Sequence, residues 1–179
     1  MQVYILKESN SDSRVAASPD TVKKMKDWGL NVVIQDNAGL NSNFSNEEYI
    51  KSGASISNEI TDISNSDLIL KINKPNEDEI ALMNEGSVLI ASLDPYNNSD
   101  TLNKLKDKGV TSFAMELMPR ITRAQSMDIL SSQSNLAGYK AVIDATYLFN
   151  KAMPMMMTAA GTIAPAKVMV FGAGVAGLQ

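Results

Sequence analysis

The feature that most constrains the fold is an apolar run that leads into regularly spaced glycines near the end of the sequence. Residues 168–171, Val-Met-Val-Phe, precede Gly172, Gly174 and Gly177 in the spacing G-x-G-x-x-G. A strand, a tight glycine turn and a helix N-terminus in this order cradle the pyrophosphate of a dinucleotide. We therefore expect residues 168–171 to form a buried strand, Gly172 to permit the turn, Gly174 to let the backbone approach phosphate, and Gly177 to let the helix pack closely.

Taken alone, this motif is a weak indicator, and a glycine-rich turn in an α/β protein that binds no nucleotide is the alternative interpretation. The acidic residue expected ~20 residues further on would lie beyond Gln179. We therefore expect the chain to be a fragment that binds NAD weakly or not at all by itself. Because the strand at 168–171 would lack its sheet neighbours, we expect the C-terminal tail to be disordered or to pair with another chain.

Short β-type runs alternate with helical patterns along the preceding sequence. Strands are predicted at residues 3–6, 31–35, 67–72, 87–92 and 111–114. Helix starts are indicated by Ser18 before Pro19, and by the capping-box pattern of Ser45 with Glu48. Glycines fall where helices should end, at Gly29, Gly53, Gly86 and Gly109. This alternation predicts an α/β fold with a Rossmann-like parallel sheet and helices on both faces.

A long helix is predicted from about residue 124 to about residue 150. Apolar or small residues recur there in steps of three and four, which defines one helical face: Met127, Leu130, Ser134, Ala137, Ala141, Ala145 and Leu148. A helix of this length suits a bridge between two domains. We expect residues 1–124 to form a Rossmann-like α/β domain, and residues 125–179 to form the bridging helix and the truncated start of a second, dinucleotide-binding Rossmann domain.

Composition excludes several classes of protein. The net charge is −4 and no large cluster of Lys or Arg occurs, which argues against a nucleic-acid partner. The chain has no Cys and no His, so thiolate chemistry and the usual proton-transfer residue are absent from it. The N-terminus lacks the apolar region of a signal peptide. Residues 152–166 carry no charge, yet they are shorter than the ~20 residues of a membrane span, and we expect a buried connector there.

A polar group of residues precedes and opens the predicted long helix. Residues 119–128 contain two arginines, hydroxyls, an amide and a carboxylate. Gln125, Asp128 and Ser131 or Ser132 are spaced to share one face of a helix. One interpretation is a clamp for a carboxamide and a ribose; the other is a solvated helix cap in which Asp128 complements the helix dipole.

Three further features carry weaker hypotheses. Arg14 follows the first predicted strand, where α/β proteins place ligand-binding residues, although a surface ion pair is the simpler interpretation. Lys71 and Lys74 lie at the end of a predicted strand, where a lysine could bind a carboxylate or act as an acid, or could simply be solvated. The methionines at 153 and 155–157 are expected to fill a core, and we expect no metal site because no His or Cys accompanies them.

The sequence resembles the alpha subunit of the proton-translocating NAD(P) transhydrogenases, a family related to alanine dehydrogenase. The resemblance is carried by AMELMP (114–119) with RITRAQSMDILSSQSNLAGYKAV (120–142), by RVAASPDTVKKM (14–25) and by TAAGTIAPAKVMVFGAGVAGLQ (158–179). It extends over essentially the whole chain, and residues 120–142 are its most specific segment.

The resemblance implies an oxidoreductase and translocase in which hydride passes directly from one nucleotide to another, coupled to proton translocation across a membrane. NAD(H) would bind this Rossmann domain and NADP(H) a partner domain, with a separate membrane domain. It also implies a homodimer, peripheral on the inner, cytoplasmic face of a bacterial membrane. The cofactor-binding residues would be Arg120, Ile121, Thr122, Gln125, Ser126, Met127, Asp128 and Ser131, with Gly172, Ala173, Gly174, Val175 and Gly177 at the pyrophosphate.

None of these residues would be an acid–base catalyst, because hydride transfer between two carbons requires only positioning and exclusion of water. The second hypothesis is an NAD-dependent oxidative deamination like that of alanine dehydrogenase, which uses a Lys and a His in this half. Lys74 lies where that Lys would be, but the expected His position falls in residues 92–95, Ser-Leu-Asp-Pro. A third hypothesis is a sensor or scaffold domain that binds NAD without turnover.

Overall fold

The computed structural model describes residues 1–9 and 11–179, and the chain divides into two compact units, Met1–Met118 and Pro119–Gln179. The sequence places the domain boundary close to residue 124, a few residues beyond this division. The residues of each unit mainly contact other residues of the same unit.

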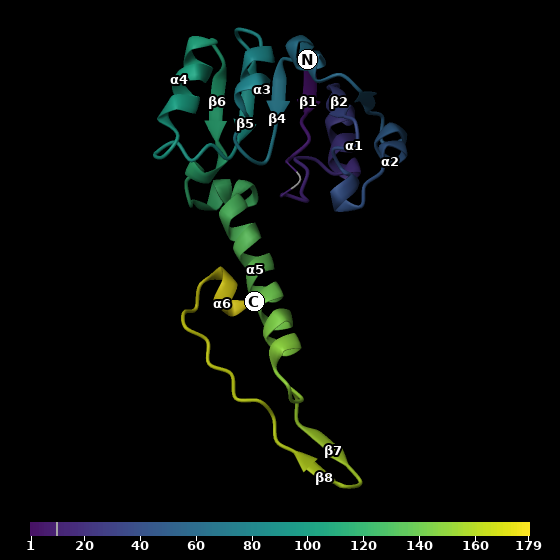
Figure 1. Cartoon of the computed structure of the whole chain (residues 1–179), viewed down its shortest axis with the longest axis vertical. Helices are drawn as coiled ribbons and strands as arrows, with labels where there is room; N and C mark the ends of the chain where they lie inside the picture. The colour runs from purple at the N-terminus through teal and green to yellow at the C-terminus, as the bar shows by residue number, and fades with distance from the viewer. Residues whose placement is uncertain (10) are drawn as a thin grey trace. The chain divides into compact units, whose positions relative to one another are not determined.

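In the described part of the first unit, six parallel strands form one sheet in the order β3-β2-β1-β4-β5-β6 (Figure 1). The strands are β1 (Gln2–Ile5), β2 (Asn31–Gln35), β3 (Ser55–Ser57), β4 (Leu68–Leu70), β5 (Val88–Ala91) and β6 (Thr111–Ala114). β1 pairs with β2 on one side and with β4 on the other, so the strand order reverses there. This topology confirms the predicted Rossmann-like α/β fold class.

The four α-helices in the described residues of this unit cover the two faces of the sheet. They are α1 (Pro19–Asp27), α2 (Asn46–Lys51), α3 (Glu77–Leu82) and α4 (Ser99–Asp107), with short 3-10 turns η1 (Leu40–Ser42), η2 (Ile60–Asn65) and η3 (Met115–Leu117). Val3 and Ile5 of β1 share one core with residues of α1 and α2, whereas Tyr4 and Leu6 share the other with residues of α3 and α4. Burial of each large apolar side chain contributes about 1.5–3 kcal/mol, so this alternation fixes the register of β1.

The predicted helix starts are present as the sequence indicates them. The Ser18 hydroxyl accepts a hydrogen bond from the Thr21 backbone N–H at 3.3 Å, and Pro19 opens α1. Ser45 and Glu48 form the reciprocal capping box of α2. Helix ends are confirmed at three of the four glycines, since Gly29, Gly53 and Gly109 follow the C-caps of α1, α2 and α4 with positive φ. The fourth, Gly86, lies instead in the turn before β5, because α3 already ends at Leu82.

Two buried carboxylates fasten the loop that follows β4. Glu8, beyond the end of β1, accepts the Ile72 backbone N–H at 2.7 Å and the Asn73 side-chain amide at 2.9 Å. Glu79 of α3 holds the Lys71 ammonium at 2.5 and 2.6 Å and accepts the Asn76 backbone N–H at 2.8 Å. Both side chains of the Lys71–Glu79 pair are more than nine-tenths buried. The loop is therefore held by two different elements, the segment after β1 and helix α3.

The second unit contains a long helix, a hairpin and a short terminal helix. These are the 3-10 turn η4 (Thr122–Met127), α5 (Ile129–Leu148), the antiparallel strands β7 (Met156–Thr158) and β8 (Gly161–Ile163), and α6 (Val175–Leu178). Figure 1 shows α6 beside α5, although the two are far apart in the sequence. None of the helices in the described residues combines the length and apolar character that a membrane crossing requires.

Four expectations for this unit were wrong. The long helix begins at Ile129 and not near residue 124, because Asp128 is extended and caps it. Met127 of the predicted face therefore precedes the helix, and within α5, which is described throughout, Gly138 alone is buried. Residues 152–166 contain the exposed β7–β8 hairpin (156–163) and are not a buried connector, and the methionines at 155–157 fill no core. Residues 168–171 are exposed and form no strand, because no other described segment pairs with them.

We predict that the Lys71–Glu79 pair makes a large contribution to the stability of the first unit. Glu79→Ala leaves the Lys71 ammonium buried without a partner, which should lower the free energy of unfolding by about 3–5 kcal/mol in urea titrations. The double variant Lys71→Met/Glu79→Leu, which replaces both charges with apolar groups of similar size, should lose less. A double variant that is as unstable as Glu79→Ala would contradict the prediction.

Candidate functional site

A cleft of about 320 Å³ lies within the second unit, between the start of α5 and the glycine-rich segment before α6. It is lined by Arg120, Leu130, Ser131, Ser134, Phe171, Gly172, Gly174, Val175, Ala176 and Gly177. Two groups of residues that the sequence singles out separately, the polar group near residue 120 and the glycine motif, therefore share one cavity. Both walls are formed by residues of the same unit.

The glycine turn leaves its backbone open on one side and closed on the other. Gly172 has φ +106°, a left-handed conformation that disfavours other residues. A methyl group placed on Gly172 or Gly174 would meet no described atom within 4 Å, so a ligand can approach this backbone. A methyl group on Gly177 would lie only 2.3 Å from the Gly172 carbonyl oxygen. Gly177 therefore allows the first turn of α6 to pack against the glycine turn.

Asp128 organises the other side of the cleft by capping α5. Its carboxylate accepts the Ser131 backbone N–H at 3.0 Å and the Ser131 hydroxyl at 2.6 Å. These two hydrogen bonds, the hydroxyl first, hold the pKa of Asp128 below its ordinary value, and the Arg120 charge adds to the effect. Asp128 is thus an ionised helix cap that fixes Ser131, a residue that lines the cleft.

The remaining predicted site residues do not line this cleft. Ile121, and Thr122, Gln125, Ser126 and Met127 of η4, are exposed, and Ala173 lies in the turn without lining the cavity. Four residues of the lining escaped the sequence interpretation: Leu130, Ser134, Phe171 and Ala176. Ser134 could have been found, because it lies three residues after Ser131 and hence on the same side of a helix.

The candidate residues of the first unit are already paired with other side chains. Arg14 donates to Asp12 through Nε at 2.9 Å and through a terminal nitrogen at 2.6 Å, which confirms the ion-pair interpretation. These bonds hold the pKa of Asp12 far below its ordinary value. Lys74 donates to the Asn98 side chain, and it borders a cleft of about 380 Å³ between the loops that follow β4 and β5. Lys71, in contrast, binds the carboxylate of Glu79 and is not solvated.

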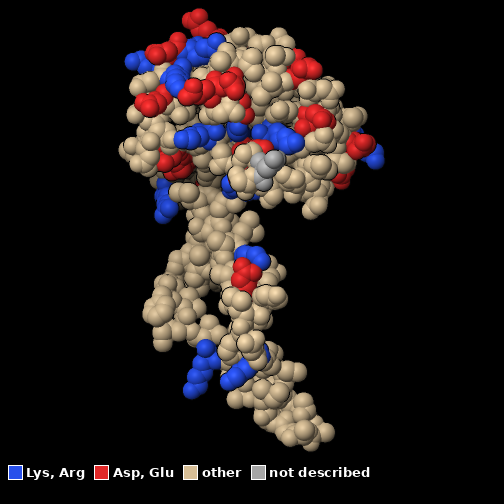
Figure 2. All heavy atoms as spheres, in the orientation of Figure 1, with Lys and Arg blue, Asp and Glu red and all other residues tan. Residues whose placement is uncertain are grey.

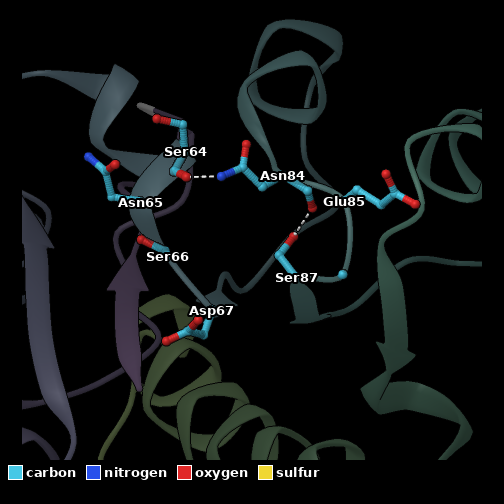
Figure 3. A pocket seen from close by; sticks show the side chains of 8 residues that line it. Ser64, Asn65, Ser66, Asp67, Asn84, Glu85 and Ser87 are labelled. Atoms are coloured by element: carbon cyan, nitrogen blue, oxygen red, sulfur yellow. Dashed lines mark hydrogen bonds between the residues drawn. The ribbon is translucent and has the colours of Figure 1, made fainter.

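A second polar cavity, of about 350 Å³, lies at the amino ends of β4 and β5 (Figure 3). It is lined by Ser64, Asn65, Ser66, Asp67, Asn84, Glu85, Gly86 and Ser87. The Ser87 hydroxyl donates to the Asn84 carbonyl at 2.7 Å, and the Asn84 amide donates across the opening to the Ser64 carbonyl. Ligands of open α/β sheets bind at the carboxyl ends of the strands, which is the opposite edge. The hydrogen bond between Asn84 and Ser64 joins the turn before β5 to the turn before β4.

Comparison with known proteins gives two family matches along the chain. Residues 4–137 match "Alanine dehydrogenase/PNT, N-terminal domain", and residues 141–179 match "Alanine dehydrogenase/PNT, C-terminal domain". The whole chain is 47% identical to an NAD(P) transhydrogenase subunit alpha of Rhodospirillum rubrum, of which it covers 48%. It is 30% identical, over 99% of its length, to an alanine dehydrogenase of Staphylococcus saprophyticus.

A solved structure gives the same result in three dimensions. The crystal structure of transhydrogenase from Sinorhizobium meliloti superposes with a TM-score of 0.95 at 52% sequence identity, over 99% of this chain and 54% of that one. The chain thus spans about half the length of the relatives that it matches. Identity to the transhydrogenases exceeds identity to the alanine dehydrogenase by a wide margin.

We predict that the cap at Asp128 makes stability depend on pH in acid. Because the folded state lowers the pKa of Asp128, its contribution is fully present above the ordinary pKa of about 4 and is lost as pH falls through the lower folded value. Asp128→Asn keeps a capping oxygen but does not titrate. The difference in urea midpoint between the wild type and Asp128→Asn should therefore shrink below about pH 4. A difference that stays constant from pH 2 to 7 would contradict this role.

Proposed function

The chain belongs to the alanine dehydrogenase/PNT family, and we propose that it forms the N-terminal portion of the NAD(H)-binding domain of an NAD(P) transhydrogenase. The observation that carries the proposal is the cleft of the second unit, which joins the glycine turn to Arg120 and Ser131. The higher identity to transhydrogenases than to alanine dehydrogenase supports this branch of the family.

The residues of the cleft fit the chemistry of NAD. The open backbone at Gly172 and Gly174 suits a pyrophosphate, which accepts hydrogen bonds from backbone N–H groups beside a helix start. At the other wall, Arg120 offers a cation and donors, and Ser131 offers a hydroxyl that the Asp128 carboxylate already orients. These groups suit the amide and hydroxyls of a nicotinamide riboside. In this proposal Val175, which lines the cleft, also contacts the bound NAD, as do residues outside the lining: Ile121, Thr122, Gln125, Ser126, Met127 and Ala173.

The chemistry supplied by bound NAD(H) is acceptance or donation of a hydride. The protein's role is to orient the nicotinamide and to exclude water, because no oxygen or nitrogen atom needs a proton in a carbon-to-carbon transfer. The described groups are consistent with that task. Asp128, with its lowered pKa, stays ionised near neutral pH and is therefore a hydrogen-bond acceptor and not an acid. Residues 1–179 contain no His that could serve as one.

The proposal extends to partners and location. NADP(H) would bind a separate domain, a membrane domain would couple hydride transfer to proton translocation, and the subunit would be peripheral on the inner face of a bacterial membrane. We also propose a homodimer. The second unit supports it, because Tyr147, Leu148 and Met157 are each more than two-thirds exposed, and few charged side chains lie on its visible face (Figure 2). Apolar surface of this extent usually marks an interface.

An alanine dehydrogenase-like activity is the second candidate, favoured by the position of Lys74 beside a cleft at the carboxyl edge of the sheet. The segment at residues 92–95 speaks against it. The Glu116 carboxylate accepts the backbone N–H groups of Leu93 and Asp94, and Asp94 has a φ of +45°. The loop is thus shaped by Glu116, and it carries no His. An NAD-binding sensor without turnover is the third candidate.

We predict that the complete gene product, mixed with an NADP(H)-binding partner domain, catalyses NADPH-dependent reduction of an NAD analogue. Arg120→Ala and Asp128→Asn should each lower the rate by about tenfold or more, since small errors of position are costly in hydride transfer. Lys74→Met is the matched control and should leave the rate unchanged.

Other outcomes would assign the protein elsewhere. Alanine-dependent formation of NADH that is lost in Lys74→Met would place it with the dehydrogenases. Tight NAD binding with neither activity would favour the sensor.

A further inference from the structure

The one buried residue of α5, which is described throughout its length, is a glycine. Gly138 lies in the middle of the helix, where a glycine normally weakens helical structure. A methyl group built on it would lie 2.2 Å from the carbonyl oxygen of Ala176, and 3.0 Å from that residue's carbonyl carbon and Cα. All three atoms belong to the backbone of α6, so no side-chain rotation could relieve the overlap.

This contact sets how closely α6 approaches α5. A second contact reinforces it, since the Asn135 amide donates to the Gln179 side chain at 2.6 Å. Because α6 follows the glycine turn directly, any displacement of α6 also displaces Gly172 and Gly174. Gly138 therefore determines the position of the turn relative to α5.

The same helix carries the opposite wall of the cleft. Ser131 lies seven residues before Gly138, which is about two helical turns, so both residues face the same side at a separation of about 10 Å along the axis. Ser131 lines the cleft and Gly138 contacts α6. The distance between the Ser131 wall and the glycine turn is thus fixed by one rigid element.

We propose that Gly138 is a positioning residue that sets the width of this cleft, so that one dinucleotide can reach both walls at once. The inference rests on the proposed function, because it assumes that NAD spans from the glycine turn to Arg120 and Ser131. A side chain at position 138 moves the turn away from α5. A ligand that needs both walls then loses its contacts with one wall and binds more weakly. A ligand that contacts only the turn keeps its affinity.

The test compares two ligands on the complete gene product by titration calorimetry. NAD reaches both walls, whereas ADP lacks the nicotinamide and its ribose and reaches only the turn. Gly138→Ala should weaken NAD binding by about tenfold or more and change ADP binding by less than about twofold. Ala137→Ser adds one heavy atom at the neighbouring position and should change neither. Alanine favours helix over glycine, so a loss of affinity would not come from a weaker α5.

Each outcome decides between the proposals. Equal weakening of NAD and ADP binding would overturn the inference and reduce Gly138 to a structural residue, as would unchanged binding of both. A wild type that binds neither ligand would overturn the proposed function itself. If Gly138→Ala does not fold, Asn135→Ala removes the second contact without adding bulk. It should weaken NAD binding more than ADP binding, and equal effects there would also overturn the inference.

Discussion

The strands in the described part of the first unit all run parallel, and this constraint decides where the chain can place its chemistry. Parallel strands direct their carboxyl ends to one edge, where loop backbone groups need hydrogen-bond partners. Carboxylates of the chain itself supply them: Glu8 and Glu79 hold the loop after β4, and Glu116 holds the loop after β5. The second oxygen of Glu116 is buried and accepts no hydrogen bond from the described residues. Carboxylates of the chain therefore shape the loops at this edge, whereas the glycine-rich turn lies in the second unit.

Local signals made most of the first unit predictable. The capping box of Ser45 and Glu48, and the Ser18 cap before Pro19, satisfy orphan backbone groups within a few residues, so they can be identified without tertiary information. Five predicted strands recur as β1, β2, β4, β5 and β6, within two residues at each end. β3 was missed because Ser55–Ser57 is short and mostly polar, and only its pairing with β2 makes it a strand.

In the site too, local sequence patterns indicated some residues, whereas others depend on contacts between residues far apart in the sequence. The glycine spacing and the resemblance together indicated Gly172, Gly174, Arg120 and Ser131, which share one cleft. Residue types suggested that Asp128 could cap a helix. They did not show that the helix begins at Ile129, because that start depends on the extended backbone of Asp128. Gly138 carried no signal at all. Its importance arises from Ala176, far along the chain, and a glycine inside a helical pattern looks unfavourable when read by itself.

The exposed apolar side chains of α5 lie on the same helix that forms one wall of the cleft. Tyr139, Val142 and Tyr147 are each exposed, and with Leu148 they are distributed around much of the circumference of α5. Helices that are apolar on all sides are buried in proteins, so α5 requires cover from further protein. Under the proposed function, that cover would also enclose the neighbouring cleft, which Arg120 lines and whose Ser131 is held by Asp128. Removing water strengthens such electrostatic interactions and prevents a hydride from being lost to side reactions. Further protein that covers the exposed apolar side chains of α5 would therefore also remove water from the cleft.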